Sequence, residues 1–200
     1  MMKSLVYDKI RLGVAVLFCL CTSSWVDAKV KLPALISDGM VLQREQSVKV
    51  WGTADAGENI TIEFQKKSYH ATADANGQWS ITLPPLKAGG PFLMQINDIK
   101  LNDILVGDVW LCSGQSNMEL PVKRVMDMFS NEILNYNNEK IRQILIPRKY
   151  NFHAPQEEMS ATSWKTLTQK NVMEFSALAY FFAKEMYEKT GIPVGLINSS

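Results

Sequence analysis

The sequence has little of three features that would indicate particular classes of protein: cysteine, histidine and surplus charge. Its 200 residues include only three cysteines and two histidines, which are too few for a disulfide scaffold and form no His/Cys pattern typical of zinc. Lys and Arg number 21 and Asp and Glu 20, so the chain lacks the basic surplus that neutralises phosphates. We therefore expect no metal site and no nucleic-acid partner. The 46% of apolar and 20% of charged residues are ordinary for a globular protein.

Residues 1–28 are predicted to be a secretory signal peptide. Basic residues precede a short apolar stretch over 12–20, and residues 26–28 provide the small side chains of a cleavage site. The apolar stretch is too short to span a bilayer comfortably, so a retained membrane anchor is the less favoured alternative. Cleavage would leave 18 cations, 18 anions and one cysteine, Cys112. The mature protein is expected in the periplasm or the extracellular medium, with no attachment to a membrane.

The remaining chain divides into two predicted domains. Residues 29–105 contain short stretches of alternating apolar residues between turn residues, with no helical stretch, which predicts an antiparallel β-sandwich. Within it, Asn76-Gly77 is a favoured two-residue hairpin turn. In residues 106–200 the pattern changes to strand, helix, strand, helix, strand. That order predicts an α/β layer structure with a parallel sheet.

The elements of the second half are predicted from apolar patterns. The continuous apolar run 109–112 is typical of a strand buried on both faces, and 141–146 and 194–197 are predicted to be further strands. A helix is predicted between the last two, with Gly191 as its C-cap. Its apolar face is expected to consist of the residues at helical spacing, namely Phe175, Leu178, Ala179, Phe182 and Met186.

A polar cluster, Ser113–Met118, directly follows the first of these strands. Ligands bind at the carboxyl ends of strands in open α/β sheets, so the position suits a site. Gly114 allows a sharp turn, and Ser116 offers a hydroxyl nucleophile and a backbone N–H for a developing oxyanion. The pattern differs from the G-x-S-x-G nucleophile elbow because Met118 replaces the second glycine. The alternative is that Ser116 and Asn117 only cap the next helix.

The segment 107–118, GDVWLCSGQSNM, resembles the nucleophile block of the sialate O-acetylesterases, a branch of the SGNH (GDSL-like) hydrolases. Three further regions share the resemblance: LISDGMVLQ (35–43) with VWG (50–52), FSALAYFF (175–182), and GIPVGLINSS (191–200). The resemblance implies a flavodoxin-like SGNH hydrolase domain preceded by the β-sandwich, and hydrolysis of O-acetyl esters of sugars, above all sialic acids, without metal or organic cofactor. Ser116 would be the nucleophile and, through its backbone N–H, one oxyanion donor. Gly114, Gln115 and Asn117 are the candidate substrate-binding residues.

The resemblance also implies catalytic groups that these 200 residues do not contain. In the family, the catalytic histidine and the other two oxyanion donors, a glycine and an asparagine, would follow residue 200. The chain is therefore expected to be an N-terminal fragment, with an incomplete hydrolase domain that is inactive alone. His70 and His153 are predicted to be a strand and a loop residue rather than the base.

Other candidates for chemistry have a simpler structural interpretation. Cys112 ends an apolar run and is expected to be inert core, Glu157-Glu158 to be a solvated loop, and Trp79 and Trp164 to be core residues. Two functions compete with sialate deacetylation: deacetylation of xylan or another polysaccharide, and carbohydrate binding without catalysis. The sequence makes no prediction of the oligomeric state.

Overall fold

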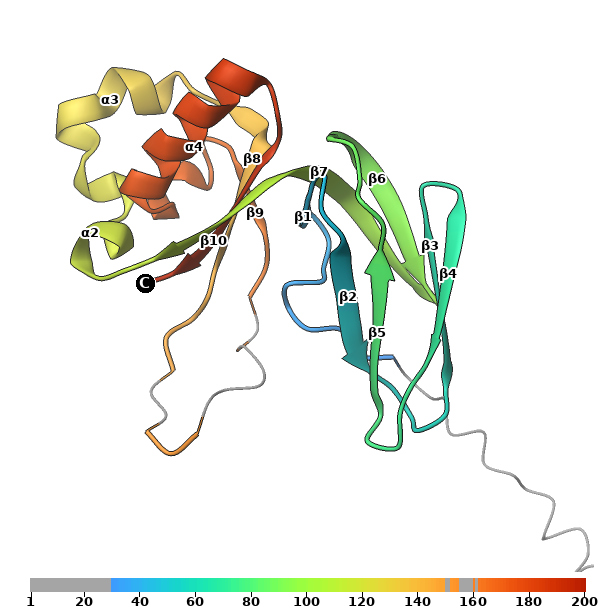
Figure 1. The fold of residues 1–200 in the computed structure, drawn as a ribbon. Helices are drawn as coiled ribbons and strands as arrows, with labels where there is room; N and C mark the ends of the chain where they lie inside the picture. Colours follow the sequence, from blue (N-terminus) through green and yellow to red (C-terminus); the bar gives the residue numbers. More distant parts are fainter. Residues whose placement is uncertain (1–29, 150–151, 155–159, 161) are drawn as a thin grey trace, which may run out of the picture.

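The computed structural model describes residues 30–149, 152–154, 160 and 162–200 (Figure 1), so the predicted signal peptide lies outside the described residues. The strands are β1 (Val41–Gln43), β2 (Val48–Thr53), β3 (Asn59–Phe64), β4 (Lys67–Thr72), β5 (Gln78–Leu83), β6 (Gly89–Ile96), β7 (Ile99–Ser113), β8 (Asn138–Leu145), β9 (Lys165–Leu167) and β10 (Val194–Ser199). The helices are α2 (Ser116–Glu119), α3 (Met126–Leu134) and α4 (Ala177–Thr190), with 3-10 turns η1 (Val122–Arg124) and η2 (Val172–Glu174). Among the described residues, no helix has the length and apolar character needed to cross a membrane.

The N-terminal half consists of strands whose side chains alternate between core and solvent, as the sequence predicts. β2 and β5 form a two-stranded antiparallel sheet, whereas β3, β4, β6 and the first part of β7 belong to a larger sheet. Apolar residues of both sheets form one core, which includes Val50 and Ile81 from the small sheet and Ile62 and Met94 from the large one. Burial of alternate residues on facing sheets is the main stabilising contribution here.

The turn at Asn76-Gly77 differs from the predicted hairpin. It connects β4 to β5, which lie in different sheets, so the prediction of a two-residue hairpin is wrong. The carboxylate of Asp74 accepts hydrogen bonds from the backbone N–H groups of Asn76 and Gln78 at 2.8 and 2.9 Å. This side-chain bonding holds a wider turn that carries the chain from one sheet to the other.

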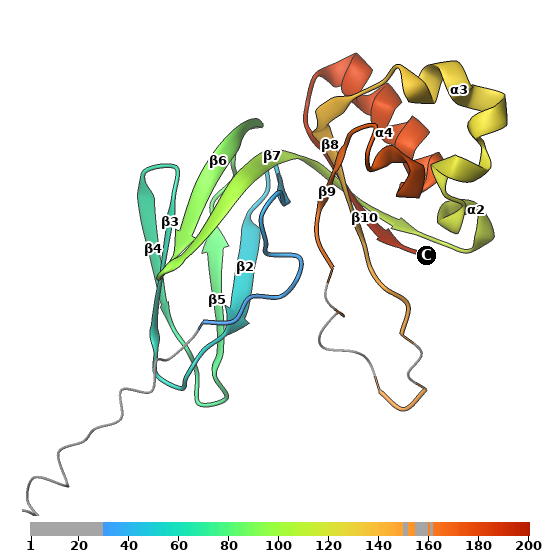
Figure 2. The ribbon, with the colours of Figure 1, turned by 180° about the vertical axis from the view of Figure 1, so that it is seen from behind.

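β7 is a single strand that runs through both halves of the molecule (Figures 1 and 2). Its first part pairs antiparallel with β6, and its second part pairs parallel with β10. Between them, residues 105–107 pair with β1. The predicted domain boundary at residue 105 falls inside this strand, and the division into a sandwich domain and a hydrolase domain stays a prediction.

The C-terminal half contains the predicted parallel sheet, in the order β7-β10-β8, with β9 antiparallel at the edge. A flavodoxin-like order would place the first of the three parallel strands between the other two. Here the last one, β10, is central, which accords with its nearly complete burial. The mixed α/β class is confirmed, but the flavodoxin-like order is not found in these three strands. The helices α2, α3 and α4 lie on the same side of this sheet (Figure 1).

The apolar run in β7 is less buried than predicted. Trp110 is 42% and Leu111 69% exposed, and only Cys112 is buried. The prediction of burial on both faces is therefore wrong for this end of β7. The reason is the position of the strand, because β10 is its one hydrogen-bonded neighbour over residues 108–113 among the described residues. The ring of Trp110 instead makes an edge-to-face contact with Phe182 of α4, with centroids 5.0 Å apart.

α4 begins and ends at local signals in the sequence. The Ser176 hydroxyl accepts a hydrogen bond from the N–H of Ala179, and Gly191 ends the helix in the left-handed conformation at φ 67°. The helix and its C-cap are confirmed, and the predicted buried face is confirmed in part. Phe175 and Ala179 are buried and Met186 packs against the core, but Leu178 and Phe182 are exposed. Tyr180 and Ala183, which were not predicted, are buried instead.

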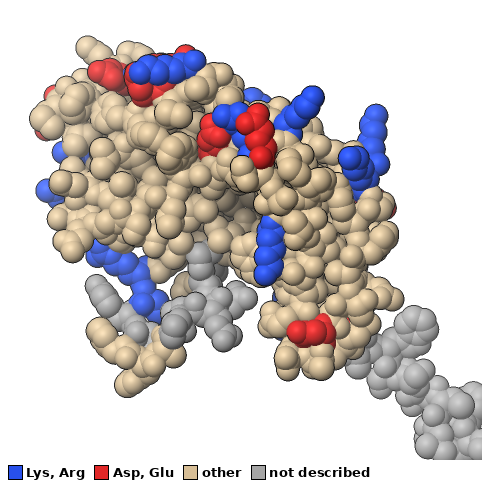
Figure 3. Space-filling view, in the orientation of Figure 1, with Lys and Arg blue, Asp and Glu red and all other residues tan. Residues whose placement is uncertain are grey.

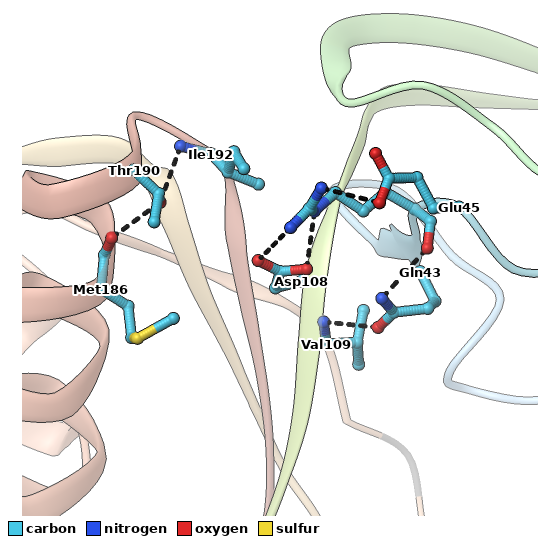
Figure 4. A network of polar contacts seen from close by, with 8 residues as sticks. Gln43, Glu45, Asp108, Val109, Met186, Thr190 and Ile192 are labelled. Carbon is cyan, nitrogen blue, oxygen red and sulfur yellow. Dashed lines mark hydrogen bonds and ion pairs between the residues drawn. The ribbon is translucent and has the colours of Figure 1, made fainter.

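Charged groups fix the junction between the two halves (Figure 4). The guanidinium of Arg44, next to β1, donates from Nε to Asp108 of β7 at 2.8 Å and pairs through Nη1 with Glu45 at 3.0 Å. The side-chain oxygen of Gln43 accepts from the N–H of Val109 at 2.9 Å. β7 is therefore held by side chains as well as by strand pairing where it passes from one half to the other.

Candidate active site

Ser116 lies at the carboxyl end of β7, where that strand gives way to α2. The strand ends at Ser113, and Ser116 is the first residue of the helix. Its side chain is exposed and lines a pocket of about 470 Å³ between α2 and the carboxyl ends of β8 and β10. The serine hydroxyl is thus accessible to a small molecule at the sheet edge where α/β proteins bind ligands.

The helix that carries Ser116 is fixed to the start of α4. The N–H of Ala177 donates to the carbonyl of Leu120, and the N–H of Val122 donates to the carbonyl of Phe175, both at 2.8 Å. The Ser176 hydroxyl lies 3.6 Å from the sulfur of Met118. These contacts anchor a four-residue helix that could not be stable by itself.

The alternative that Ser116 and Asn117 cap this helix is wrong. The N-cap residue is Gln115, and no side chain makes a capping hydrogen bond to α2. Gly114 permits the close approach of Met118, since a Cβ added there would lie 3.2 Å from the Met118 Cβ. Gly114, Gln115 and Asn117 are exposed beside Ser116, but of these four residues only Ser116 lines the pocket.

The two histidines lie elsewhere. His70 is in β4 of the N-terminal half, with its Nδ1 3.1 Å from the hydroxyl of Thr61. His153 belongs to the segment 152–154 of the loop between β8 and β9, which lies away from α2 in both views (Figures 1 and 2). No histidine is among the described residues that line the pocket. A histidine base for Ser116 is therefore not supplied by the described part of this pocket.

The other predicted candidates have structural roles. Cys112 is buried, and burial raises the pKa of its thiol, which disfavours the thiolate needed for nucleophilic attack. Trp79 and Trp164 are core residues as predicted. Glu157 and Glu158 lie outside the described residues. Within the described part of the chain, no three His, Cys, Asp or Glu side chains are grouped to hold a metal ion.

Two polar residues of the pocket were not predicted individually. Asn198, near the end of β10, is 3% exposed, and its side-chain oxygen has no hydrogen-bond partner among the described residues. Arg148 follows β8, pairs with Glu119 of α2, and donates from Nε to the carbonyl of Ser200 at 3.1 Å. A polar residue within the otherwise apolar end of a parallel strand is the signal that could have identified Asn198.

Charges on the wider surface are mixed. On the face drawn in Figure 3, Lys and Arg side chains lie beside Asp and Glu side chains in small groups, and neither sign covers a large area. The expectation that nucleic acid is not a partner stays a prediction from charge.

No family model matches the chain, but individual proteins do. It is 29% identical over 192 residues to a sialate O-acetylesterase of Homo sapiens and 27% identical over 211 residues to the one of Mus musculus. These alignments cover 85% and 94% of this chain, but only 36% and 39% of those proteins.

A solved structure is similar to a comparable share of this chain. The crystal structure of a carbohydrate acetylesterase from Xanthomonas citri matches with a TM-score of 0.80 and 39% identity, covering 86% of this chain and 40% of that one. The chain thus spans little more than a third of the length of the curated relatives, and 40% of this enzyme. The predicted resemblance to the sialate O-acetylesterases is confirmed over most of the chain.

Proposed function

We propose that the protein is a carbohydrate O-acetylesterase in which Ser116 is the nucleophile. The observation that carries this proposal is the position of Ser116, exposed in a pocket at the carboxyl edge of the parallel sheet. The relatives named as sialate O-acetylesterases and the similar carbohydrate acetylesterase support the reaction class.

The proposed reaction is a two-step acyl transfer. The Ser116 oxygen attacks the carbonyl carbon of the acetyl group, and a base takes the hydroxyl proton. The Ser116 backbone N–H donates to the oxyanion. The C–O bond to the sugar then breaks, the sugar oxygen receives the proton, and water hydrolyses the acetyl-enzyme to acetate. The family resemblance implies that the base is a histidine, which the described pocket does not contain.

We propose O-acetylated sialic acids as the substrates, since the similar curated proteins are named for them. The pocket of about 470 Å³ has room for a single sugar. A second pocket of about 300 Å³ shares Leu145, Pro147 and Glu174 with it, and could receive a group attached to that sugar. Comparing acetate release from O-acetylated sialic acid and from acetylated xylan would separate the two carbohydrate substrates.

We also propose that the protein is exported. The pattern of residues 1–28 supports a cleaved signal peptide. Cleavage after Ala28 would leave Lys29 as the first residue, which N-terminal sequencing of the mature protein would test. An intact N-terminus would contradict it.

The decisive experiment replaces Ser116 in the protein expressed from its whole reading frame. Ser116→Ala is expected to reduce acetate release at least about a thousandfold, because nucleophile and base act as a unit. Ser113→Ala is the matched control, since Ser113 is exposed at the same sheet edge but does not line the pocket; it should retain activity.

Two outcomes would contradict the proposal. Undiminished acetate release by Ser116→Ala would exclude this serine as the nucleophile. Retention on a glycan column that survives Ser116→Ala, with no ester hydrolysis by the unsubstituted protein, would instead identify a carbohydrate-binding protein.

A further inference from the structure

The charged side chains of the Ser116 pocket are mostly neutralised by one another. Arg148 pairs with Glu119, and the Lys123 ammonium lies 3.0 Å from the carboxylate of Glu174. All four residues line the pocket, together with a fifth charged residue, Arg124. Arg124 has no ion pair with any residue that the structure describes. The described pocket therefore carries one uncompensated positive charge.

The backbone holds Arg124 in a fixed place relative to Ser116. Arg124 ends η1, and its N–H donates to the carbonyl of Pro121 at 2.9 Å. Val122, two residues earlier, is fully buried and bonded to Phe175. η1 follows directly after the helix that carries Ser116. The guanidinium is thus tethered to the same anchored segment as the proposed nucleophile.

A spare cation has no evident use in the hydrolysis of an acetyl ester alone. The ester is neutral, and the negative charge that develops on its oxygen is assigned to the Ser116 N–H and further donors. A guanidinium, in contrast, matches the geometry of a carboxylate through two parallel N–H donors. The charge of Arg124 therefore suits an anionic group elsewhere on the sugar.

We propose that Arg124 binds the carboxylate of an acidic O-acetylated sugar and so selects sialic acids over neutral sugars. This inference rests on the proposed esterase function and names its specificity-determining residue. It also gives a physical reason to prefer sialic acid over acetylated xylan, whose backbone sugars are neutral.

The test compares an O-acetylated sialic acid with its methyl ester, in which the carboxylate charge is removed. Acetate release from each substrate is followed with the protein expressed from its whole reading frame. Arg124→Gln is expected to raise KM for the acid about tenfold, the effect of losing one charge-assisted contact. The methyl ester and p-nitrophenyl acetate should be hydrolysed at unchanged rates. Arg124→Lys should restore part of the preference for the acid, because it keeps the charge but not the paired donors.

Lys100→Gln removes an exposed cation from the N-terminal half and controls for net charge. It should leave KM and the rate of hydrolysis unchanged for all three substrates. Equal loss on all three substrates in Arg124→Gln would show a role in the oxyanion or in folding, and would overturn the proposal. So would an unsubstituted protein that does not distinguish the acid from its methyl ester. Failure of the esterase function itself is distinct, because then none of the substrates would release acetate.

Discussion

Two glycines allow the strands at the junction to approach more closely than any other residue would. A Cβ added at Gly107 of β7 would lie 2.0 Å from the carbonyl oxygen of Pro193, and one at Gly195 of β10 would lie 2.7 Å from the Cβ of Val41. Both contacts are too short for real atoms. Gly107 and Gly195 are therefore required by packing, since neither has a positive φ.

Gly107→Ala is expected to destabilise the chain by about 3 kcal/mol, because the backbone around Pro193 must move to admit the methyl group. Urea unfolding followed by circular dichroism would measure the loss. Gly57→Ala is the control for backbone strain, because Gly57 has φ +81° but open space around its Cβ; it should cost about 1 kcal/mol. Equal costs at the two positions would contradict the steric explanation.

At the scale of elements, the sequence predicts the C-terminal end of α4 better than the face that the helix buries. Gly191 acts locally as the C-cap, so it can be recognised without knowing the fold. The buried face depends on what lies beneath the helix. Ala179 and Ala183 let the backbone approach the sheet, and Tyr180 fills the remaining space. A prediction from the size of the apolar side chains alone places Leu178 and Phe182 on the buried face, but both are exposed.

The same distinction applies to the candidate site. The polar segment after β7 and the serine at the sheet edge follow from a local pattern and from the general location of sites in α/β sheets. Asn198 and Arg148 come to the pocket from other strands, and that depends on strand order. Asn198 could have been identified as a polar residue at the end of an apolar strand, but the central place of β10 has no signature in a single sequence, so its arrival beside Ser116 could not be predicted.

Tyr180 should make the packing of α4 on α3 sensitive to alkaline pH. Its hydroxyl donates to the carbonyl of Glu132 at 3.1 Å, and burial, the largest cause, raises the pKa of Tyr180 to about 12. The folded state thus favours the neutral phenol. This contribution to stability is fully present below pH 10 and decreases as the pH rises towards 12.

Urea unfolding at pH 8 and pH 11 would measure this dependence. Tyr180→Phe should lose about 1 kcal/mol at pH 8, from the missing hydrogen bond, and should lose less further stability at pH 11 than the unsubstituted chain. Tyr69→Phe, in the other half, is the control and should retain the full decrease. If Tyr180→Phe lost as much stability between pH 8 and pH 11 as the unsubstituted chain, groups other than Tyr180 would cause the pH dependence.

At the scale of the whole molecule, one buried arginine connects segments that are distant in sequence. Arg142 of β8 is 2% exposed and donates to the carbonyl of Gly39 and to the carboxylate of Asp103, both at 2.8 Å. It also bonds the Asp103 carbonyl. One guanidinium therefore connects strand β8 of the parallel sheet to the loop before β1 and to the middle of β7.

Arg142→Leu is expected to destabilise the chain by about 2–3 kcal/mol, because it leaves the carbonyls of Gly39 and Asp103 without their donor, whereas the half-exposed Asp103 carboxylate stays solvated. Lys123→Leu is the matched control, since its ion pair with Glu174 is largely exposed and should contribute at most about 1 kcal/mol. Urea unfolding of both variants at pH 7 would measure the difference. Similar losses would mean that Arg142 contributes no more than a surface charge.

The length of β7 has a mechanical consequence. A strand of 15 residues extends up to about 50 Å, with one end embedded among the strands of the N-terminal half and the other carrying the turn to Ser116. No flexible linker interrupts it. A bulky tag or a surface support attached near the β6–β7 hairpin would therefore keep a nearly constant orientation relative to Ser116, because a continuous strand connects the two.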